Sequence, residues 1–131
     1  MTVVDASVWI AYFKKGDAFR EQARVIIRSL ISNQEKIYIP AIAFTEVAGA
    51  IKRITKNNDD AWDALLGMKD LDPEILIDFG KLEPIATELA INHGIRGADA
   101  CYLAVAEITG ANLVTFDKEQ QKAFEEMSKI W

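Results

Sequence analysis

The sequence predicts one α/β domain, a three-layer α/β/α sandwich with a central parallel sheet. Short β-branched runs alternate with longer stretches of helical periodicity, the pattern of a sheet covered by helices. The 131 residues fit a single folding unit, and no linker or internal repeat divides them. With 50% hydrophobic and 27% charged residues, the composition is that of a chain that folds by itself. We therefore treat residues 1–131 as one domain.

Four apolar runs are predicted to be strands because each is too short for a helix. Continuous apolar runs are typical of a parallel sheet covered on both faces, whereas half-exposed antiparallel strands alternate. The connecting crossovers should be right-handed. The predicted strands are Thr2–Val4, Ile37–Ile39, Ile75–Ile77 and Asn112–Thr115.

Apolar residues at helical spacing mark the helices between these strands. The first stripe, predicted to face the sheet, contains Phe19, Ala23, Ile26, Ile27 and Leu30. A second helix begins just after Pro40 and carries Phe44, Val47, Ile51 and Ile54. In a third, Asn58 or Asp59 provides the cap, and the apolar residues are Trp62, Leu65, Leu66 and Met68. Further helices are predicted over Pro84–Asn92, Ala98–Thr109 and Lys118–Met127, with Gly94 and Gly110 as C-terminal caps.

Charge and cysteine content restrict the function and the compartment. Twenty acidic against 15 basic residues give a net charge of −5, which argues against a general electrostatic grip on nucleic acid. Any nucleic-acid role must then use local charge or bound cations. A single Cys points to a reducing compartment, and neither a basic leader nor an apolar run long enough for a bilayer is present. We expect a soluble, cytoplasmic protein without a membrane partner.

Four carboxylates are predicted to meet at one edge of the sheet. Asp5 follows the first strand and Asp117 the last, Glu46 lies early in the helix after the second strand, and Asp99 lies in the first turn of a later helix. In an open parallel sheet, ligands bind beyond the carboxyl ends of the strands, where the chain order reverses. All four acids can reach that place.

Three of these acids also have local explanations. Asp5 could be a turn residue or an N-cap, and Asp99 could be a favourable charge at the positive end of a helix dipole. Asp117, with Gln120 three residues later, resembles a capping box. Considered singly, none of the three indicates a catalytic site.

Glu46 is harder to explain as a surface residue, because its window Ala-Ile-Ala-Phe-Thr-Glu-Val-Ala-Gly-Ala contains no other charge. Ala50 and Arg53 follow at i+4 and i+7, so one helix face offers a carboxylate, a small residue and a cation. That face could hold a phosphate near a metal, although a solvent-facing Glu with an incidental Arg is the alternative.

Clustered carboxylates raise one another's pKa values and need a cation to neutralise them. An all-oxygen ligand set points to Mg²⁺ or Mn²⁺ rather than zinc. These ions polarise phosphoryl oxygens and lower the pKa of bound water, which is the chemistry of phosphodiester hydrolysis. Ser7, Thr115 and Arg96 lie within three residues of the acids. The hydroxyls could orient a carboxylate or a water, and Arg96 could pair with a phosphate, while turns and caps explain the hydroxyls equally well.

The sequence resembles the PIN-domain ribonucleases, and most closely the VapC-type toxins of toxin–antitoxin pairs. Three stretches carry the resemblance: Val-Val-Asp-Ala-Ser-Val-Trp-Ile, Pro-Ala-Ile-Ala-Phe-Thr-Glu-Val, and Arg-Gly-Ala-Asp-Ala-Cys-Tyr-Leu-Ala through Asn-Leu-Val-Thr-Phe-Asp. They appear in the family's order and cover nearly the whole chain.

The resemblance implies an Mg²⁺- or Mn²⁺-dependent endoribonuclease. It assigns the family's acidic site to Asp5, Glu46, Asp99 and Asp117 as catalytic and metal-ligating residues, and its hydroxyl partner to Ser7. Members differ in whether the fourth acid binds metal directly or through water. The resemblance further implies a homodimer and an antitoxin whose C-terminal segment occupies the active-site groove.

Other functions remain open at this point. A PIN domain can serve RNA maturation instead of toxicity, and an inactive PIN scaffold could only bind a partner. A phosphoacceptor receiver domain is also a small acidic Mg²⁺-binding unit, but it needs an acidic pair where this chain has Asp5 and Ala6. Outside the acids, His93 is interpreted as a helix-end residue without an evident partner, and Cys101 as a core residue. Trp62 is interpreted as a core residue, with packing at a subunit interface as the alternative.

Overall fold

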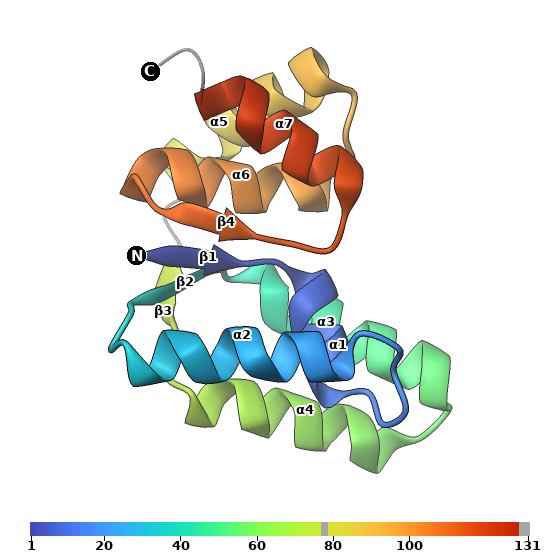
Figure 1. The fold of residues 1–131 in the computed structure, drawn as a ribbon. Coiled ribbons are helices and arrows are strands. Elements are labelled where there is room, and N and C mark those ends of the chain that lie inside the picture. Colours follow the sequence, from blue (N-terminus) through green and yellow to red (C-terminus); the bar gives the residue numbers. More distant parts are fainter. Residues whose placement is uncertain (77–78, 129–131) are drawn as a thin grey trace.

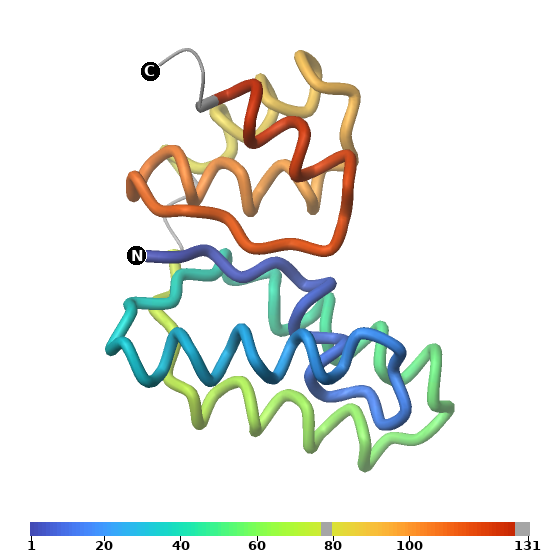
Figure 2. The backbone as a smooth tube through the Cα atoms, viewed as in Figure 1, coloured from blue at the N-terminus to red at the C-terminus, as the bar shows by residue number. Residues whose placement is uncertain are grey.

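The order of the strands in the sheet decides where the predicted acidic site should lie. The computed structural model describes residues 1–76 and 79–128, and in them four parallel strands form one sheet in the order β3-β2-β1-β4. The strands are β1 (Thr2–Val4), β2 (Ile37–Pro40), β3 (Glu74–Leu76) and β4 (Asn112–Val114). The chain leaves β1 toward β2 on one side and returns to β4 on the other, so the order reverses beside β1 (Figure 2).

Helices cover the sheet in two layers (Figure 1). α5, α6 and α7 lie on one side of the sheet, and α1 to α4 lie on the other. Their bounds are α1 (Ala6–Phe13), α2 (Arg20–Ser32), α3 (Ile42–Thr55), α4 (Asn58–Asp70), α5 (Phe79–His93), α6 (Gly97–Thr109) and α7 (Lys118–Ser128). The three-layer parallel α/β architecture predicted from the sequence is confirmed. None of the helices in the described parts of the chain is long and apolar enough to span a membrane.

The core is built around β1, whose three residues are all buried. Trp9 on α1 is fully buried and donates its indole N–H to the Val4 carbonyl at 3.0 Å, which fixes α1 against the strand it follows. The expected cover on both faces of the sheet is incomplete at its edge, where Ile75 of β3 is exposed. β3 is an edge strand that pairs with β2, so its side chains are less covered than those of the inner strand β1.

Several strand limits differ from the prediction. β2 includes Pro40, which pairs with Leu76. Proline is tolerated there because Pro40 is the last residue of β2 and lies beyond the positions that pair with β1, so the ladder to β1 needs no N–H from it. β4 ends one residue earlier than predicted, at Val114. The predicted third strand is shifted to begin at Glu74, and its last predicted residue, Ile77, lies outside the described residues.

Helix α1 was not predicted, because Ala-Ser-Val-Trp-Ile-Ala-Tyr-Phe is apolar nearly all round and shows no stripe. The stripe on α2 was predicted to face the sheet, but α2 packs mainly against α1. The N-terminal member of that stripe, Phe19, is exposed, whereas Ala23 and Ile27 are buried. The extra helix therefore occupies the place expected for α2.

The predictions for two further helices, α4 and α5, need correction. The cap of α4 is Asn57, whose side chain accepts from the Asp60 N–H at 3.1 Å, and not Asn58 or Asp59. Trp62 is 63% exposed, so its interpretation as a core residue is wrong. Helix α5 begins at Phe79, before its predicted start, and contains Pro84. The C-terminal caps are as predicted: Gly94 and Gly110 both have positive φ angles.

Candidate active site

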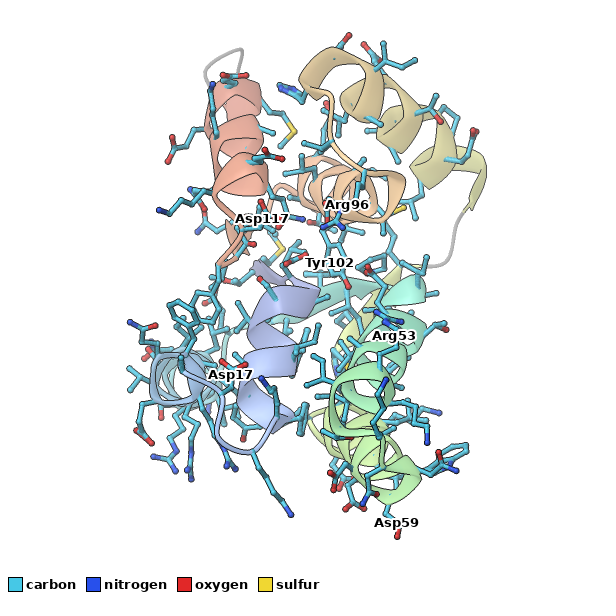
Figure 3. The ribbon with its side chains drawn as sticks, turned by 90° about the vertical axis from the view of Figure 1, so that its right-hand side faces the viewer. Asp17, Arg53, Asp59, Arg96, Tyr102 and Asp117 are labelled. Carbon is cyan, nitrogen blue, oxygen red and sulfur yellow. The ribbon has the colours of Figure 1, made fainter. Side chains whose placement is uncertain are left out.

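A cleft of about 490 Å³ lies at the carboxyl end of the sheet, where the strand order reverses. Figure 3 faces this side of the molecule, with Arg96, Tyr102, Arg53 and Asp117 labelled on the two halves that flank it. All four predicted acids line the cleft, together with the predicted Ser7, Arg53 and Arg96. The full lining is Asp5, Ala6, Ser7, Ile10, Ile42, Thr45, Glu46, Ala50, Arg53, Arg96, Ala98, Asp99 and Asp117.

Asp5 is fixed at the floor of the cleft and is only 3% exposed. Its Oδ2 accepts from the Ser7 backbone N–H at 2.9 Å, which makes it the N-cap of α1, and from the Thr115 hydroxyl at 3.2 Å. Its Oδ1 accepts from Gln120 Nε2 at 3.0 Å. The local role as a cap and the predicted role in the site therefore apply to the same residue.

Ser7 and Thr115 form a directed hydrogen-bond chain that ends on Asp5. Thr115 donates its only hydroxyl proton to Asp5, so the 3.2 Å contact between the two hydroxyls must have Ser7 as the donor. Ser7 Oγ in turn accepts from the Phe116 N–H at 3.0 Å, and Thr115 Oγ1 accepts from the Asp117 N–H at 3.0 Å. The loop after β4 is thereby fastened to the start of α1.

Asp117 forms only half of the predicted capping box. Its Oδ1 accepts from the Gln120 N–H at 3.0 Å, as an N-cap should. The Gln120 side chain does not return the bond but turns inward, where its Nε2 donates to Asp5 and to the Asp99 carbonyl at 3.1 Å. The capping box is thus wrong in its second half, because Thr115 already satisfies the Asp117 N–H.

Glu46 enters the cleft from α3 and is half-buried. Burial raises its pKa, the nearby Tyr102 hydroxyl lowers it, and the charges of Asp5 and Asp99 raise it. Within the described residues, neither Glu46 Oε1 nor Tyr102 Oη has a hydrogen-bond partner, although both atoms are buried. A carboxylate oxygen in this condition is suited to bind a cation, because it gives up no existing bond.

Asp99, in the first turn of α6, is paired with Arg96. Arg96 Nε lies 3.3 Å from Asp99 Oδ2, and the arginine side chain is 85% exposed. Burial raises the pKa of Asp99, Arg96 opposes that shift, and Asp5 and Asp117 add to it. Asp99 also raises the pKa of Arg96, with smaller contributions from Asp117 and Glu46. The pKa of Asp99 therefore reflects the charges of two neighbouring acids and of one exposed arginine.

The type of donor at these residues favours a divalent cation, whereas the spacing of the side chains does not yet form a complete binding site. Their donors are all oxygen, and the pKa values of Glu46 and Asp99 are raised partly by neighbouring acids, which a cation would relieve. Between residues 1–76 and 79–128, however, no three acid, His or Cys side chains already stand close enough to hold a metal together. The chemistry of the donor set fits, while binding would require the carboxylates that line the cleft to move closer together.

Tyr102 and the inward role of Gln120 were not predicted. Tyr102 lies three residues after Asp99 and so shares its helix face, a signal present in the spacing. Gln120 resembled an ordinary cap. Away from the cleft, His93 does have a partner, since its Nδ1 lies 3.2 Å from Glu126 Oε2, and Cys101 is only partly buried.

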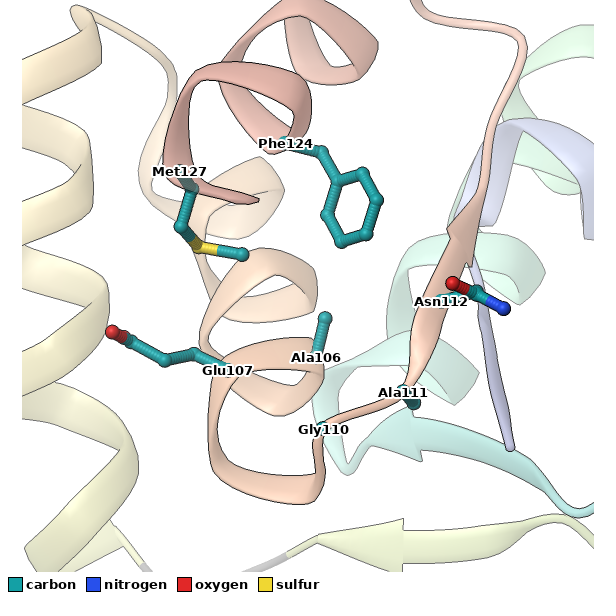
Figure 4. Close-up of a pocket in the computed structure, with 7 residues that line it drawn as sticks. All are labelled: Ala106, Glu107, Gly110, Ala111, Asn112, Phe124 and Met127. Carbon is teal, nitrogen blue, oxygen red and sulfur yellow. The ribbon is translucent and has the colours of Figure 1, made fainter. Parts of the chain in front are cut away.

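A separate hollow lies between α6, β4 and α7, at the opposite end of α6 (Figure 4). Among its lining residues Glu107 is the one carboxylate, and burial together with the charge of Glu88 raises the pKa of Glu107. This hollow lacks the convergence of acids seen in the cleft. Its lining is Ala106, Glu107, Gly110, Ala111, Asn112, Phe124 and Met127.

Comparisons with solved structures identify the same fold in other proteins. The chain is similar to the crystal structure of Mycobacterium tuberculosis VapC20, described as a sarcin-ricin loop cleaving toxin, with a TM-score of 0.78 and 22% identity over 94% of this chain and 95% of that one. It is also similar to PAE2754 from Pyrobaculum aerophilum, with a TM-score of 0.69 and 23% identity over 96% of this chain and 90% of that one. No curated protein matches the sequence.

At these identities the two solved structures establish a shared fold. The PIN domain family model, by contrast, matches the sequence itself, and it does so over residues 2–126. That range contains both ends of the sheet and all four acids of the cleft. The chain therefore belongs to the PIN-domain family.

Proposed function

We propose that this protein is an Mg²⁺- or Mn²⁺-dependent endoribonuclease that hydrolyses RNA phosphodiesters. The observation that carries the proposal is the convergence of Asp5, Glu46, Asp99 and Asp117, from four separate parts of the chain, on one cleft at the switch point of the sheet. Membership of the PIN family supports a nuclease. The net charge of −5 makes a bound cation the natural partner for a polyanionic substrate.

In this proposal the four acids hold the cation, which supplies Lewis acidity toward a phosphoryl oxygen and acidifies water when bound. Asp5 is oriented by three hydrogen-bond donors and cannot rotate freely. Glu46 would offer Oε1, which has no hydrogen-bond partner within residues 1–76 and 79–128. Asp99, whose present partner Arg96 is exposed, would hold the cation from the start of α6. Ser7 and Thr115 position Asp5 and the loop that carries Asp117.

Arg53 and Arg96 are the proposed phosphate-binding residues. Both line the cleft and both are exposed, from the last turn of α3 and from the residue that precedes α6. A guanidinium presents a planar fork of donors that matches phosphate oxygens. The Arg53 side chain passes close to Gly49, where a Cβ would come within 3.3 Å of Nη1, so the absence of a side chain there leaves room for the guanidinium.

We further propose that the protein is the toxin of a type II toxin–antitoxin pair, acting in the cytoplasm as a homodimer that an antitoxin inhibits. The support is its likeness to VapC20, which is described as a toxin, over nearly the full length of both chains. The exposed Trp62 and Leu66 on α4 provide apolar surface of the kind that a subunit or antitoxin covers.

The proposal is tested by incubating purified protein with single-stranded and structured RNAs, with Mg²⁺ and with EDTA. We expect cleavage only with the cation, and a loss of about 100-fold or more for Asp99→Asn, because a cation site contributes several kcal/mol to the transition state. Glu107→Gln is the matched control, since it removes a carboxylate on the same helix outside the cleft. Cleavage in EDTA, or full activity of Asp99→Asn, would refute the proposal.

A further inference from the structure

An aromatic pair, in which one ring is exposed and the other is partly buried, stands next to the acidic cleft. The rings of Phe19 and Phe116 are stacked, with centroids 5.4 Å apart and an interplanar angle of 30°, and Phe19 is 51% exposed. Phe116 lies between Thr115 and Asp117 in the chain, and its N–H donates to Ser7 Oγ. The pair is therefore attached directly to the loop that carries part of the proposed site.

The backbone of Phe19 is held by the turn that leads into α2, and its ring is held by stacking on Phe116. Its backbone N–H donates to Asp17 Oδ1 at 2.8 Å, and Asp17 is itself paired with Lys14 at 3.7 Å. The next residue, Arg20, starts α2, with its N–H on the Asp17 carbonyl at 3.1 Å. A fixed ring loses little conformational entropy when another flat group stacks on it.

A second hollow of about 330 Å³ continues from the cleft along the start of α7. It shares Asp117 with the cleft and has Phe116 in its wall. Two exposed lysines, Lys118 and Lys122, also line it, one turn apart on the helix. The complete lining is Thr115, Phe116, Asp117, Lys118, Gln121, Lys122 and Glu125.

We propose that this surface is a nucleotide-binding subsite for single-stranded RNA: a base next to the cleaved phosphodiester stacks on the Phe19–Phe116 pair, while Lys118 and Lys122 bind the adjoining phosphates. The inference rests on the proposed nuclease function, and it identifies a nucleotide of the substrate that this chain binds next to the acidic cleft. Aromatic faces beside cationic side chains are the usual means of binding single strands, where bases are free to stack.

Lys118 and Lys122 supply the positive charge of this hollow, against Asp117 and Glu125 in the same lining. The first residue of α7 is a lysine, and the positive end of the helix dipole adds to its charge, while Glu119 in the same turn opposes it. Glu125 is the one acid of the hollow besides Asp117, and it accepts from Gln121 Nε2 at 3.2 Å. The two lysines are therefore the groups of this hollow that can bind phosphate.

The test measures binding apart from cleavage. Oligoribonucleotides containing the fluorescent base 2-aminopurine are titrated with full-length protein in EDTA, and stacking is read as fluorescence quenching. We expect quenching by the wild type and by Phe19→Trp. For Phe19→Leu we expect loss of quenching and a Kd about 5- to 150-fold higher, the range for one base–aromatic stack.

Matched variants separate the subsite from general effects. Trp62→Leu removes an exposed aromatic on α4, remote from the hollow, and should leave quenching and Kd unchanged. The double variant Lys118→Gln/Lys122→Gln should reduce the slope of log Kd against log salt by about 1.4, whereas Lys81→Gln on α5 should not alter it. Thermal melting of Phe19→Leu checks that the fold is retained, which we expect because leucine keeps an apolar contact with Phe116.

The outcomes are distinct from those of the nuclease test. If Phe19→Leu behaves as Trp62→Leu does, or if wild-type protein quenches no oligonucleotide, the subsite is refuted, and the aromatic pair would then be a protein contact. If binding depends on Phe19 while Mg²⁺ elicits no cleavage, the nuclease proposal fails and the subsite stands. Cleavage that is equally fast in wild type and Phe19→Leu at subsaturating RNA would also refute the subsite.

Discussion

The carboxamide of Gln120 donates a 3.0 Å hydrogen bond to Asp5, although the two residues are separated by 115 positions in the sequence. Gln120 is 1% exposed, and the same Nε2 also donates to the Asp99 carbonyl at 3.1 Å. One buried amide therefore links α7, α6 and the residue that caps α1. The position of Asp5 depends on a helix at the far end of the chain.

Replacing this amide should destabilise the fold. Gln120→Leu keeps the approximate volume but leaves a buried carboxylate oxygen without its donor, so we expect a loss of about 1–3 kcal/mol in the free energy of unfolding. Urea denaturation measures the change. Gln121→Leu is the neighbouring control, because it removes only an exposed bond to Glu125 and should cost less than about 0.5 kcal/mol. Equal losses in the two variants would show that the Gln120 bond to Asp5 contributes little.

Stability should depend on pH through Glu46. Burial, with the charges of Asp5 and Asp99, raises its pKa above the ordinary value of 4.5, so the folded protein keeps a proton that the unfolded chain has released. A raised carboxyl pKa means that stability falls as pH rises above that ordinary value. We expect Glu46→Gln to flatten the decline in melting temperature that begins as the pH rises above 4.5.

Glu107→Gln serves as the control for this pH effect. The pKa of Glu107 is also raised, by burial and by Glu88, so this variant should flatten the decline as well. Only Glu46→Gln should, in addition, reduce the stabilisation that Mg²⁺ gives near neutral pH, because Glu107 lies outside the cleft. Mg²⁺ stabilisation that is the same in both variants would contradict the assignment of Glu46.

The two hydroxyls should contribute unequally. Thr115 Oγ1 donates to Asp5 and accepts from the Asp117 N–H, whereas Ser7 Oγ accepts from the Phe116 N–H and donates only to Thr115. We expect Thr115→Val to lower the free energy of unfolding by about 1–3 kcal/mol and Ser7→Ala by about 1 kcal/mol. Chemical denaturation compares them, and a larger cost for Ser7→Ala would show that the chain of bonds is assigned in the wrong direction.

Arg96 should act on substrate binding more than on stability. Its guanidinium is exposed and its pairing with Asp99 is of the surface kind, which contributes little to folding. Arg96→Gln should weaken single-stranded RNA binding and reduce the slope of log Kd against log salt by about 0.7, the amount for one phosphate contact. Arg24→Gln on α2 also breaks a surface pair, with Glu21, and should leave the slope unchanged. An unaltered slope for Arg96→Gln would exclude a phosphate contact there.

The sequence predicted the architecture and the presence of the four acids around one cleft, because both follow from local patterns. Apolar runs define the strands, and the parallel order places Asp5 and Asp117 at one edge of the sheet. It did not predict α1, since a helix that is apolar on all sides carries no stripe. The inward turn of Gln120 was equally hidden, because a capping pattern reports only neighbours in sequence, whereas its partner Asp5 lies at the other end of the chain.

Trp62 shows the same limit from the opposite side. An aromatic residue at helical spacing is interpreted as core, but the buried face of α4 is formed by Ala64 and Met68. Which side of an amphipathic helix meets the fold depends on its neighbour, and α4 packs on α3 rather than on the sheet. Periodicity alone contains no information about that neighbour.

The central claim is that the carboxylates of the cleft together bind at least one divalent cation. Isothermal titration calorimetry of the protein with Mn²⁺ tests it most directly, because it needs neither RNA nor a partner. We expect saturable binding by wild-type protein, an affinity at least about tenfold lower for Glu46→Gln and for Asp99→Asn, and no change for Glu107→Gln. Absence of saturable binding, or equal affinity in all four proteins, would contradict the account.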